Sequence, residues 1–215
     1  MTTVVLVDDQ EMVRAGLRVM LESRGVEVLG EAADGLAGVQ EVRRLRPDVC
    51  LMDIRMPVLD GIEATRRLVA EGSPTRVLVL TTYDLDDLVH AALRHGAAGF
   101  VLKTTPVDRL VQGIELVAEG EALLSPSLTR RLIEQHLQRP APGAAERLTE
   151  GLTEREREVL VLIGRGCSND EIAAELYVSR ATVKSHINRV FAKLGVTSRV
   201  QAVVRCYEHG LVGPR

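Results

Sequence analysis

The stretch VCLMDIRMPVLDG, residues 49–61, begins as a short apolar run and then places an aspartate, Asp53, directly after it. Residues 4–10, VVLVDDQ, repeat this form, because four apolar residues lead into Asp8 and Asp9. Apolar runs of this length are typical of strands that are buried on both faces, as in a parallel sheet. Two strands that deliver carboxylates at the same end predict one acidic site at the carboxyl edge of that sheet.

The segments around these runs alternate between strand-like and helix-like patterns. Strands are predicted over residues 3–7, 26–33, 48–52, 76–81 and 99–102. Apolar residues at helical spacing predict helices over residues 11–24, 36–45, 60–70, 84–95 and 106–118. Gly25 and Gly96 stop two of these helices, and Pro106 stands near the start of the last, where its missing N–H costs little. Five strand–helix units predict an α/β fold with a doubly wound, five-stranded parallel sheet.

The composition predicts a protein that folds around aliphatic cores and has no membrane-spanning segment. Hydrophobic residues make up 46% of the 215 residues, but only 2% are aromatic. No apolar stretch approaches the roughly 20 residues of a membrane span, and the N-terminus lacks the basic-then-apolar pattern of a signal segment. The three cysteines, Cys50, Cys167 and Cys206, are widely spaced and form no CxxC pair. We therefore expect reduced thiols, a cytoplasmic location and no membrane partner.

The pattern changes after the fifth strand–helix unit. A further helix is expected over residues 126–138, and residues 138–147, QRPAPGAAER, have the prolines and glycine of a linker. Beyond the linker all segments are helical in pattern, starting at a capping box formed by Thr153 and Glu156. Helices follow over residues 169–177, 180–194 and 198–209. The predicted organisation is an α/β domain over residues 1–120, a helical linker over 121–147 and a small all-α domain over 148–215.

Three neighbouring carboxylates need compensation, because otherwise one of them would take up a proton. A hard cation with oxygen ligands provides it, which predicts Mg²⁺ as cofactor, and a carboxylate beside Mg²⁺ is a plausible phosphoryl acceptor. Phosphoryl chemistry also needs a positive charge and a hydroxyl close by, and Lys103 and Thr81 end two further strands. Each residue alone has an ordinary structural explanation, as a helix cap, strand residue or surface charge. Five of them at successive strand ends favour a functional site.

Residues 1 to about 120 resemble the flavodoxin-like receiver domain of bacterial two-component response regulators. The resemblance is carried by Asp8, Asp9, Asp53 with Met56 and Pro57 after it, Gly61, Thr81 and Lys103. It implies that Asp53 is phosphorylated and that Asp8, Asp9, Asp53 and the backbone carbonyl of Arg55 hold Mg²⁺. It also implies that Lys103 pairs with the phosphoryl group and that Thr81 and Phe100 form a switch pair.

Two residues depart from the pattern of that family. Thr104 follows the lysine where many receivers have proline, so a cis Lys–Pro bond is excluded. Phe100 stands where tyrosine is frequent, so no hydroxyl can form a hydrogen bond when the side chain turns. The phosphoryl chemistry is retained, but the output face is expected to signal differently.

Residues 168–196, SNDEIAAELYVSRATVKSHINRVFAKLGV, are predicted to form two helices around a turn at residues 178–179. Apolar residues of both helices face inward, while the second presents polar and basic residues to solvent. Between Arg180 and Tyr207 there are six basic residues and no acidic one, which favours a polyanionic partner. The candidate DNA contacts are Arg180, Thr182, Lys184, Ser185, Asn188 and Arg189. From these residues alone, a small four-helix regulatory or dimerisation module stays an alternative.

The segment from about Leu152 to Leu211 resembles the LuxR-type DNA-binding domain. This resemblance implies a recognition helix over residues 180–194 and a dimerisation helix over residues 198–209. A receiver followed by this domain is the NarL/FixJ architecture. We therefore expect a transcription factor that is phosphorylated by a sensor histidine kinase, forms a homodimer and binds an inverted DNA repeat. It would not be an enzyme, beyond catalysing its own phosphorylation and dephosphorylation.

Three other classes of protein fit the sequence less well. A haloacid-dehalogenase-type phosphatase needs a second aspartate two residues after its nucleophile, and Arg55 occupies that position. A nucleotide-binding flavodoxin-like domain needs a glycine-rich or hydroxyl-rich first loop, whereas VDDQEMVR carries negative charge there. A degenerate receiver used only as a scaffold would not need the full acidic set and Lys103.

Overall fold

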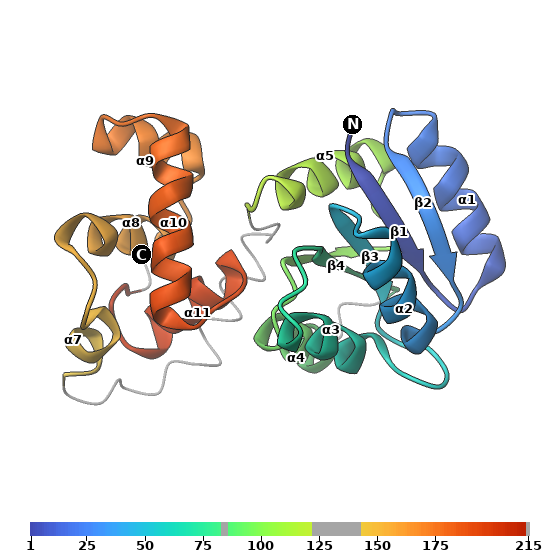
Figure 1. Ribbon diagram of the computed structural model, residues 1–215, viewed down its shortest axis with the longest axis horizontal. Coiled ribbons are helices and arrows are strands. Elements are labelled where there is room, and N and C mark those ends of the chain that lie inside the picture. The colour runs from blue at the N-terminus through green and yellow to red at the C-terminus, as the bar shows by residue number, and fades with distance from the viewer. Residues whose placement is uncertain (83–85, 122–142, 214–215) are drawn as a thin grey trace. The chain divides into compact units, whose positions relative to one another are not determined.

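The computed structural model describes residues 1–82, 86–121 and 143–213. The chain divides into two compact units, residues 1–123 and 124–215 (Figure 1). The helix expected over residues 126–138 lies outside the described residues, as does the start of the one expected over 84–95.

The first unit is built on a five-stranded parallel sheet in the order β2-β1-β3-β4-β5 (Figure 1). Its strands are β1 (Thr3–Val7), β2 (Glu27–Ala32), β3 (Val49–Asp53), β4 (Arg76–Thr81) and β5 (Gly99–Leu102). The register aligns their carboxyl ends, since Val7 lies opposite Met52, Asp53 opposite Leu80, and Thr81 opposite Leu102. The predicted parallel sheet is confirmed, and the aspartates and Lys103 leave it along one edge.

In the described part of the first unit, five helices cover the two faces of the sheet. They are α1 (Glu11–Glu22), α2 (Gly35–Leu45), α3 (Gly61–Ala70), α4 (Asp86–Arg94) and α5 (Val107–Ala118). Helices α1 and α5 contact each other on one face, while α2 contacts α3 and α3 contacts α4 on the other. All five residues of β3 are buried because this central strand is covered on both sides.

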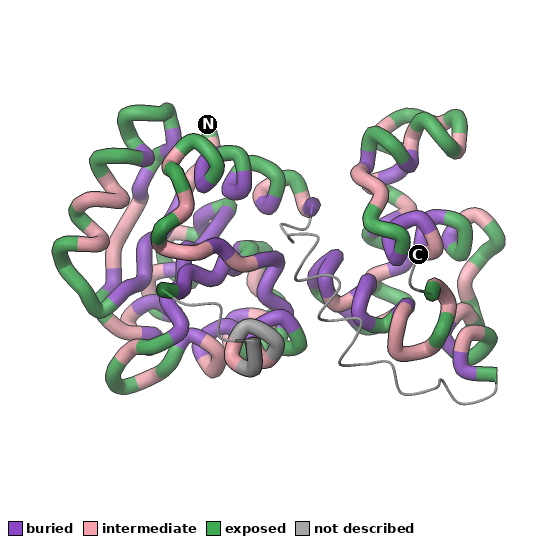
Figure 2. The backbone as a smooth tube through the Cα atoms, turned by 180° about the vertical axis from the view of Figure 1, so that it is seen from behind, coloured by how far each residue is buried: buried purple, intermediate pink, exposed green. Residues whose placement is uncertain are grey.

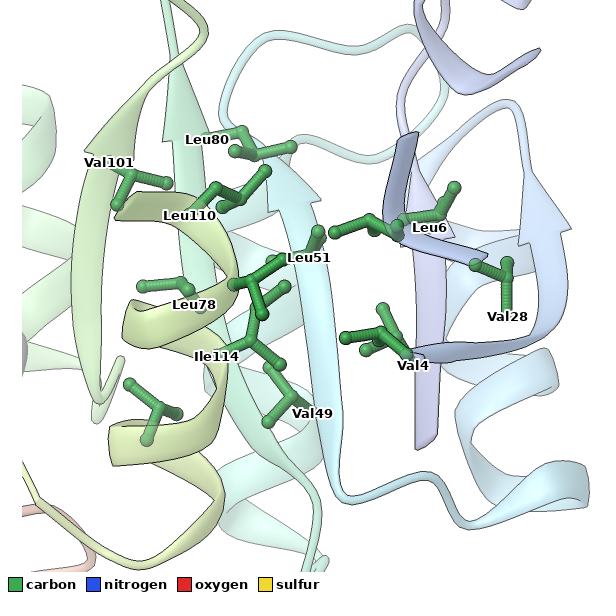
Figure 3. Packing of buried hydrophobic residues seen from close by; sticks show 14 of the residues in the cluster. Val4, Leu6, Val28, Val49, Leu51, Leu78, Leu80, Val101, Leu110 and Ile114 are labelled. Atoms are coloured by element: carbon green, nitrogen blue, oxygen red, sulfur yellow. The ribbon is translucent and has the colours of Figure 1, made fainter. Parts of the chain in front are cut away.

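Alternate residues of the strands supply the core beneath α1 and α5. Val49 and Leu51 of β3 point to this face, beside Leu78 of β4, and Leu110 and Ile114 of α5 lie over them (Figure 3). In the tube representation the buried segments gather in the interior of this unit and the exposed ones on its rim (Figure 2). The aliphatic core that the composition predicts is therefore present.

The second unit is entirely helical in its described residues. It contains α7 (Ala144–Thr149), α8 (Glu154–Gly164), α9 (Asn169–Leu176), α10 (Arg180–Leu194) and α11 (Arg199–Glu208). The predicted capping box of Thr153 and Glu156 is confirmed at the start of α8. Its core is formed by buried residues that include Leu160, Ile163, Ile172 and Val190. None of the helices in the described ranges is long and apolar enough to span a bilayer.

Some predicted boundaries were wrong. Helix α7 begins inside the segment interpreted as linker, because the residues after Gly143, AAERLT, favour a helix. Helix α9 ends at Leu176, one residue early, since Tyr177 adopts the left-handed conformation with φ of 55°. Helix α1 ends at Glu22, and Gly25 with φ of 80° turns the chain into β2.

The three cysteines are free thiols, as predicted for reduced residues. Burial raises the pKa of Cys50 and of Cys206 to about 12, so neither is a reactive thiolate at neutral pH.

Candidate functional site

An acidic cluster lies where β1 and β3 end. Asp8 directly follows β1, Asp9 follows Asp8, and Asp53 is the last residue of β3. One carboxylate oxygen of each lies within 4.8 Å of the others. Asp8 is 1% exposed and Asp53 6% exposed, whereas Asp9 is open to solvent. The sheet therefore brings together the three carboxylates that the sequence predicted to meet.

Lys103 enters this cluster from the end of β5. Its Nζ lies 2.6 Å from Asp8 Oδ2 and 2.9 Å from Asp53 Oδ2. Its backbone N–H donates to the carbonyl of Thr81 at 2.7 Å, which ties the residue after β5 to the last residue of β4. This hydrogen bond positions the lysine so that its side chain reaches across β4 to the acidic edge.

Burial and the neighbouring charges both shift the pKa values of Asp53 and Lys103. Burial is the largest influence on Asp53 and raises its pKa, and the opposing hydrogen bond from Lys103 does not cancel this effect. Burial alone would lower the pKa of Lys103, but hydrogen bonds with Asp8 and Asp53 outweigh it, so its pKa is raised. The lysine is thus held in its charged form beside a carboxylate that is poorly solvated.

The backbone after Asp53 is held by a close approach of two chain segments. The N–H of Ile54 donates to Asp53 Oδ1 at 2.8 Å, and the N–H of Gly61 donates to the carbonyl of Ile54 at 2.9 Å. A Cβ atom on Gly61 would lie 1.9 Å from the backbone oxygen of Asp53, so only glycine fits at the start of α3. The VLDG end of the opening stretch therefore holds the aspartate in place.

The acidic cluster fits a hard divalent cation. Asp8 Oδ2 is buried, and apart from its ion pair with Lys103 it has no hydrogen-bond partner among the described residues. The donor set consists of carboxylate oxygens, which suit Mg²⁺, and the open side of Asp9 leaves room for the waters that Mg²⁺ retains. The carbonyl of Arg55 stays a predicted ligand, and its side chain is exposed.

The predicted switch residues lie near the cluster at different depths. Thr81 is buried at the end of β4, 3% exposed. Phe100 is half-buried in β5 and lies opposite Val79 in the register, two residues before the strand ends. The fold thus brings Thr81 to the acidic edge, while Phe100 lies further back in the sheet. Their roles in switching stay predictions.

The sequence analysis missed Arg14, which contacts the backbone of the acidic loop, and Glu31, which contacts Arg14. Arg14 Nη1 donates to the carbonyl of Asp8 at 2.7 Å, and its Nε lies 3.3 Å from Glu31 Oε2. In the sequence Arg14 is one basic residue of an amphipathic helix, and no local pattern connects it to a glutamate 17 residues away.

Helices α9 and α10 form a second candidate site, in the helical unit. Val183, Ile187 and Val190 of α10 are buried, so the opposite side of this helix faces solvent. Of the predicted DNA contacts, four are exposed and two are half-buried: Thr182, Ser185, Asn188 and Arg189 in the first group, Arg180 and Lys184 in the second. A helix with one buried stripe and one polar, basic side is suited to the major groove.

Several side chains near the start of α10 already have partners within the chain. Ser179 caps α10 by accepting from the N–H of Thr182 at 3.1 Å, and the two hydroxyls lie 2.8 Å apart. Arg180 pairs with Asp170 at 3.5 Å. Arg180 and Thr182 would therefore have to exchange internal contacts for contacts with DNA.

Two of the six basic residues in the acid-free stretch hold the unit together. Lys193 Nζ lies 2.6 Å from Glu156 Oε2, which ties α10 to α8. Arg199, 6% exposed, donates to Asn169 Oδ1 at 2.8 Å and to the carbonyl of Cys167, which ties α11 to the start of α9. The sequence analysis counted both as evidence for a polyanionic partner, and the structure gives each of them a partner within the unit as well.

Comparisons with known proteins assign a family to each of the two units. The model of the response regulator receiver domain matches residues 4–115, and that of bacterial regulatory proteins of the luxR family matches residues 150–206. Transcriptional regulatory protein LiaR of Bacillus subtilis (strain 168) is 39% identical over 213 residues, covering 99% of this chain and 100% of LiaR.

Solved structures give the same result. Response regulator ChrA of a heme-sensing two-component system is 36% identical with a TM-score of 0.53, and 98% of each chain is covered. RcsB, in a structure of two dimers bound to two parallel DNAs, is 26% identical with a TM-score of 0.55, covering 96% of this chain and 98% of RcsB. The chain therefore belongs to the response regulators of two-component systems that join a receiver domain to a LuxR-type DNA-binding domain.

Proposed function

We propose that Asp53 accepts a phosphoryl group from a sensor histidine kinase and that this modification controls DNA binding by the C-terminal domain. The observation that carries this proposal is the poorly solvated Asp53 carboxylate, with Asp8 and Asp9 within 4.8 Å and the Lys103 ammonium at 2.9 Å. The only reaction that we assign to the chain itself is formation and hydrolysis of the acyl phosphate on Asp53. Because its target is DNA, the proposed place of action is the cytoplasm.

In the proposed transfer, a carboxylate oxygen of Asp53 bonds to phosphorus as the phosphorus–nitrogen bond of a phosphohistidine breaks. The electron pair of that bond stays on the imidazole. Mg²⁺, held by Asp8, Asp9, Asp53 and the Arg55 carbonyl, would offset the negative charge of the carboxylates and phosphoryl oxygens. Lys103, whose Nζ lies 2.9 Å from Asp53 Oδ2, would exchange this contact for one with a phosphoryl oxygen.

The proposed conformational response to phosphorylation involves Thr81 and Phe100, which end or lie in the strands beside Lys103. The Thr81 hydroxyl would move to the phosphoryl group, and Phe100 would turn into the space that Thr81 leaves. The adjacent face around α4 and α5 would repack as a result. Phe100 brings no hydroxyl to this movement, so the shift would depend on packing alone.

We further propose that the phosphorylated protein binds an inverted DNA repeat as a homodimer. Helix α10 would read the major groove and α11 would pair the two copies. A single α10 offers few base contacts, so specific affinity requires two copies, and half-sites would lie one helical turn apart, about 10 bp. The RcsB structure, of dimers bound to DNA, supports DNA binding as a dimer.

Labelling with a small phosphodonor tests the phosphoacceptor. Acetyl phosphate with Mg²⁺ should add one hydroxylamine-labile phosphoryl group, detected by mass spectrometry of the intact protein. Asp53→Asn should abolish labelling, because an amide is neither a nucleophile nor an anionic ligand.

Asp60→Asn is the matched control for this labelling. It makes the same chemical change seven positions along, at a residue that caps α3 by accepting from the N–H of Glu63 at 2.8 Å. Asparagine caps equally well, so the fold and the labelling should be retained. Undiminished labelling of Asp53→Asn would refute the assignment.

A further inference from the structure

We propose that Arg14 is a positioning residue for the metal site. Together with Glu31, it fixes the peptide that joins Asp8 to Asp9, so that both carboxylates are presented to the cation. This inference rests on the proposed function, because it concerns the Mg²⁺ that phosphorylation of Asp53 requires.

Arg14 is held in one orientation by contacts at both ends of its guanidinium. It lies in α1 with a side chain 14% exposed, donates through Nη1 to the Asp8 carbonyl at 2.7 Å, and pairs through Nε with Glu31 Oε2 at 3.3 Å. Glu31 is itself fixed, because its other oxygen accepts from Arg18 Nε at 2.5 Å. The carboxylate of Glu31 therefore lies between two guanidinium groups, and the position of Arg14 is set by β2 as well as by its own helix.

The carbonyl that Arg14 contacts controls the direction of Asp9. It belongs to the planar peptide between Asp8 and Asp9, so its orientation fixes where the next Cα stands. Asp8 has other restraints: its N–H donates to Ala32 at 3.1 Å, and its Oδ1 accepts from the N–H of Gln10 at 3.0 Å.

The Asp9 side chain, by contrast, is exposed, and among the described residues none donates a hydrogen bond to it. Its placement beside Asp8 and Asp53 depends on the backbone alone. Arg14 restrains this backbone on the N-terminal side of Asp9, and the hydrogen bond from Gln10 to Asp8 restrains it on the other. Losing Arg14 frees the first of these peptides and should affect the ligand geometry of Asp9 first.

Charge and position make opposite predictions for Arg14. If it acted only through its charge, its removal would strengthen Mg²⁺ binding, because a cation near a cation site is repulsive. If it acts by holding the Asp8–Asp9 peptide, its removal should weaken Mg²⁺ binding, since groups that orient metal ligands typically contribute about 10–100-fold in affinity. The direction of the change therefore decides between the two.

The experiment is titration calorimetry of the unphosphorylated full-length protein with Mg²⁺ alone. Arg14→Ala should raise the Kd for Mg²⁺ by about tenfold or more. The matched control is Arg24→Ala, which removes the same charge from a residue that pairs with Asp108 at 2.6 Å. This control should leave the Kd unchanged. At saturating Mg²⁺, the labelling rate of Arg14→Ala with acetyl phosphate should return towards that of the unaltered protein. An equal or lower Kd for Arg14→Ala would overturn the proposal.

A second variant guards against loss of the fold. Arg14→Lys keeps the charge but replaces the two-pronged guanidinium by one ammonium, which cannot hold Asp8 and Glu31 in the same way. Thermal unfolding identifies a misfolded Arg14→Ala, in which case Arg14→Lys decides: a higher Kd supports the proposal and an unchanged Kd overturns it. Failure of the phosphoacceptor assignment is distinguishable, because it would appear as unlabelled Asp53 in an unaltered protein that still binds Mg²⁺.

Discussion

Replacing Gly61 by alanine should distort the aspartate site and destabilise the receiver domain. The added Cβ would lie 1.9 Å from the backbone oxygen of Asp53 and 2.9 Å from its carbonyl carbon. Ordinary contact begins at 3.4 Å, so the chain must separate by about 1.5 Å at this point. Neither segment can move by rotating a side chain, since one is the end of β3 and the other the start of α3.

The expected destabilisation is large for the addition of one methyl group. Overpacking costs typically about 1–3 kcal/mol and occasionally more, and a clash between two backbone segments belongs at the upper end of that range. The lower entropy of the unfolded alanine chain returns only about 0.4–1 kcal/mol. The net cost is therefore about 2–2.6 kcal/mol. For a domain of this size, 1 kcal/mol corresponds to roughly 4 °C in Tm, so we expect the Tm of the receiver to fall by about 8–10 °C.

Scanning calorimetry of the full-length protein measures this change, and Gly16→Ala is the control. Gly16 lies within α1, where an added Cβ would meet only Met20 Cε at 4.0 Å, so alanine should stabilise the helix by about 0.5–1 kcal/mol. The same substitution should thus have opposite signs at the two positions. The reasoning is refuted if Gly61→Ala leaves the Tm unchanged or raises it as Gly16→Ala does.

Three further predictions concern charged residues. Lys103→Ala should tighten Mg²⁺ binding, because its ammonium competes for the two buried carboxylates, and should slow labelling by acetyl phosphate; titration calorimetry and labelling rates check both. The pKa of Glu156 is lowered from 4.5 to about 2, mainly by the hydrogen bond from Lys193, so its stabilisation is complete above pH 4.5 and is lost as the pH falls towards 2. The destabilisation caused by Glu156→Gln in urea unfolding should therefore be present at pH 7 and shrink between pH 4.5 and 2; a constant difference would contradict this. Lys184→Ala should cost about 1–3 kcal/mol and relax preference at one base pair per half-site, whereas Arg189→Ala should weaken all sequences alike and reduce the salt slope by about 1. Binding assays over a range of salt concentrations, with matched and altered half-sites, separate the two effects.

The order of strands and helices could be predicted because it depends on local patterns. The apolar run before Asp53 identifies β3 whatever it packs against, and Gly25 marks the turn after a helix because of its own backbone freedom. Helix α7 could not be predicted in the same way. Gly143 and the prolines before it indicate a loop, and the helix that follows is only six residues long.

Contacts between distant segments account for what the sequence did not predict at the site. The carboxyl ends of parallel strands lie along one edge of a sheet, so the proximity of Asp8 and Asp53 could be predicted from the sequence. Gly61 could be recognised as part of a family pattern. Why a glycine is needed there, namely the carbonyl of Asp53 beside it, can be seen only in the structure. Lys193 and Arg199 could not be separated from the basic residues predicted to contact DNA, because charge alone does not reveal which partner is near.

The buried contact between Arg199 and Asn169 has a consequence for the half-site spacing that two DNA-binding domains can accept. It couples the first residue of α11 to the first of α9, so the helix proposed to pair two copies cannot shift freely against the helix-turn-helix. Two domains paired through α11 would thus act as a ruler of fixed length. Inserting one base pair between half-sites turns one of them by roughly 35° about the DNA axis, since ~10 bp make a full turn. A ruler of this kind cannot follow that rotation, so correct half-site spacing should matter as much as correct half-site sequence.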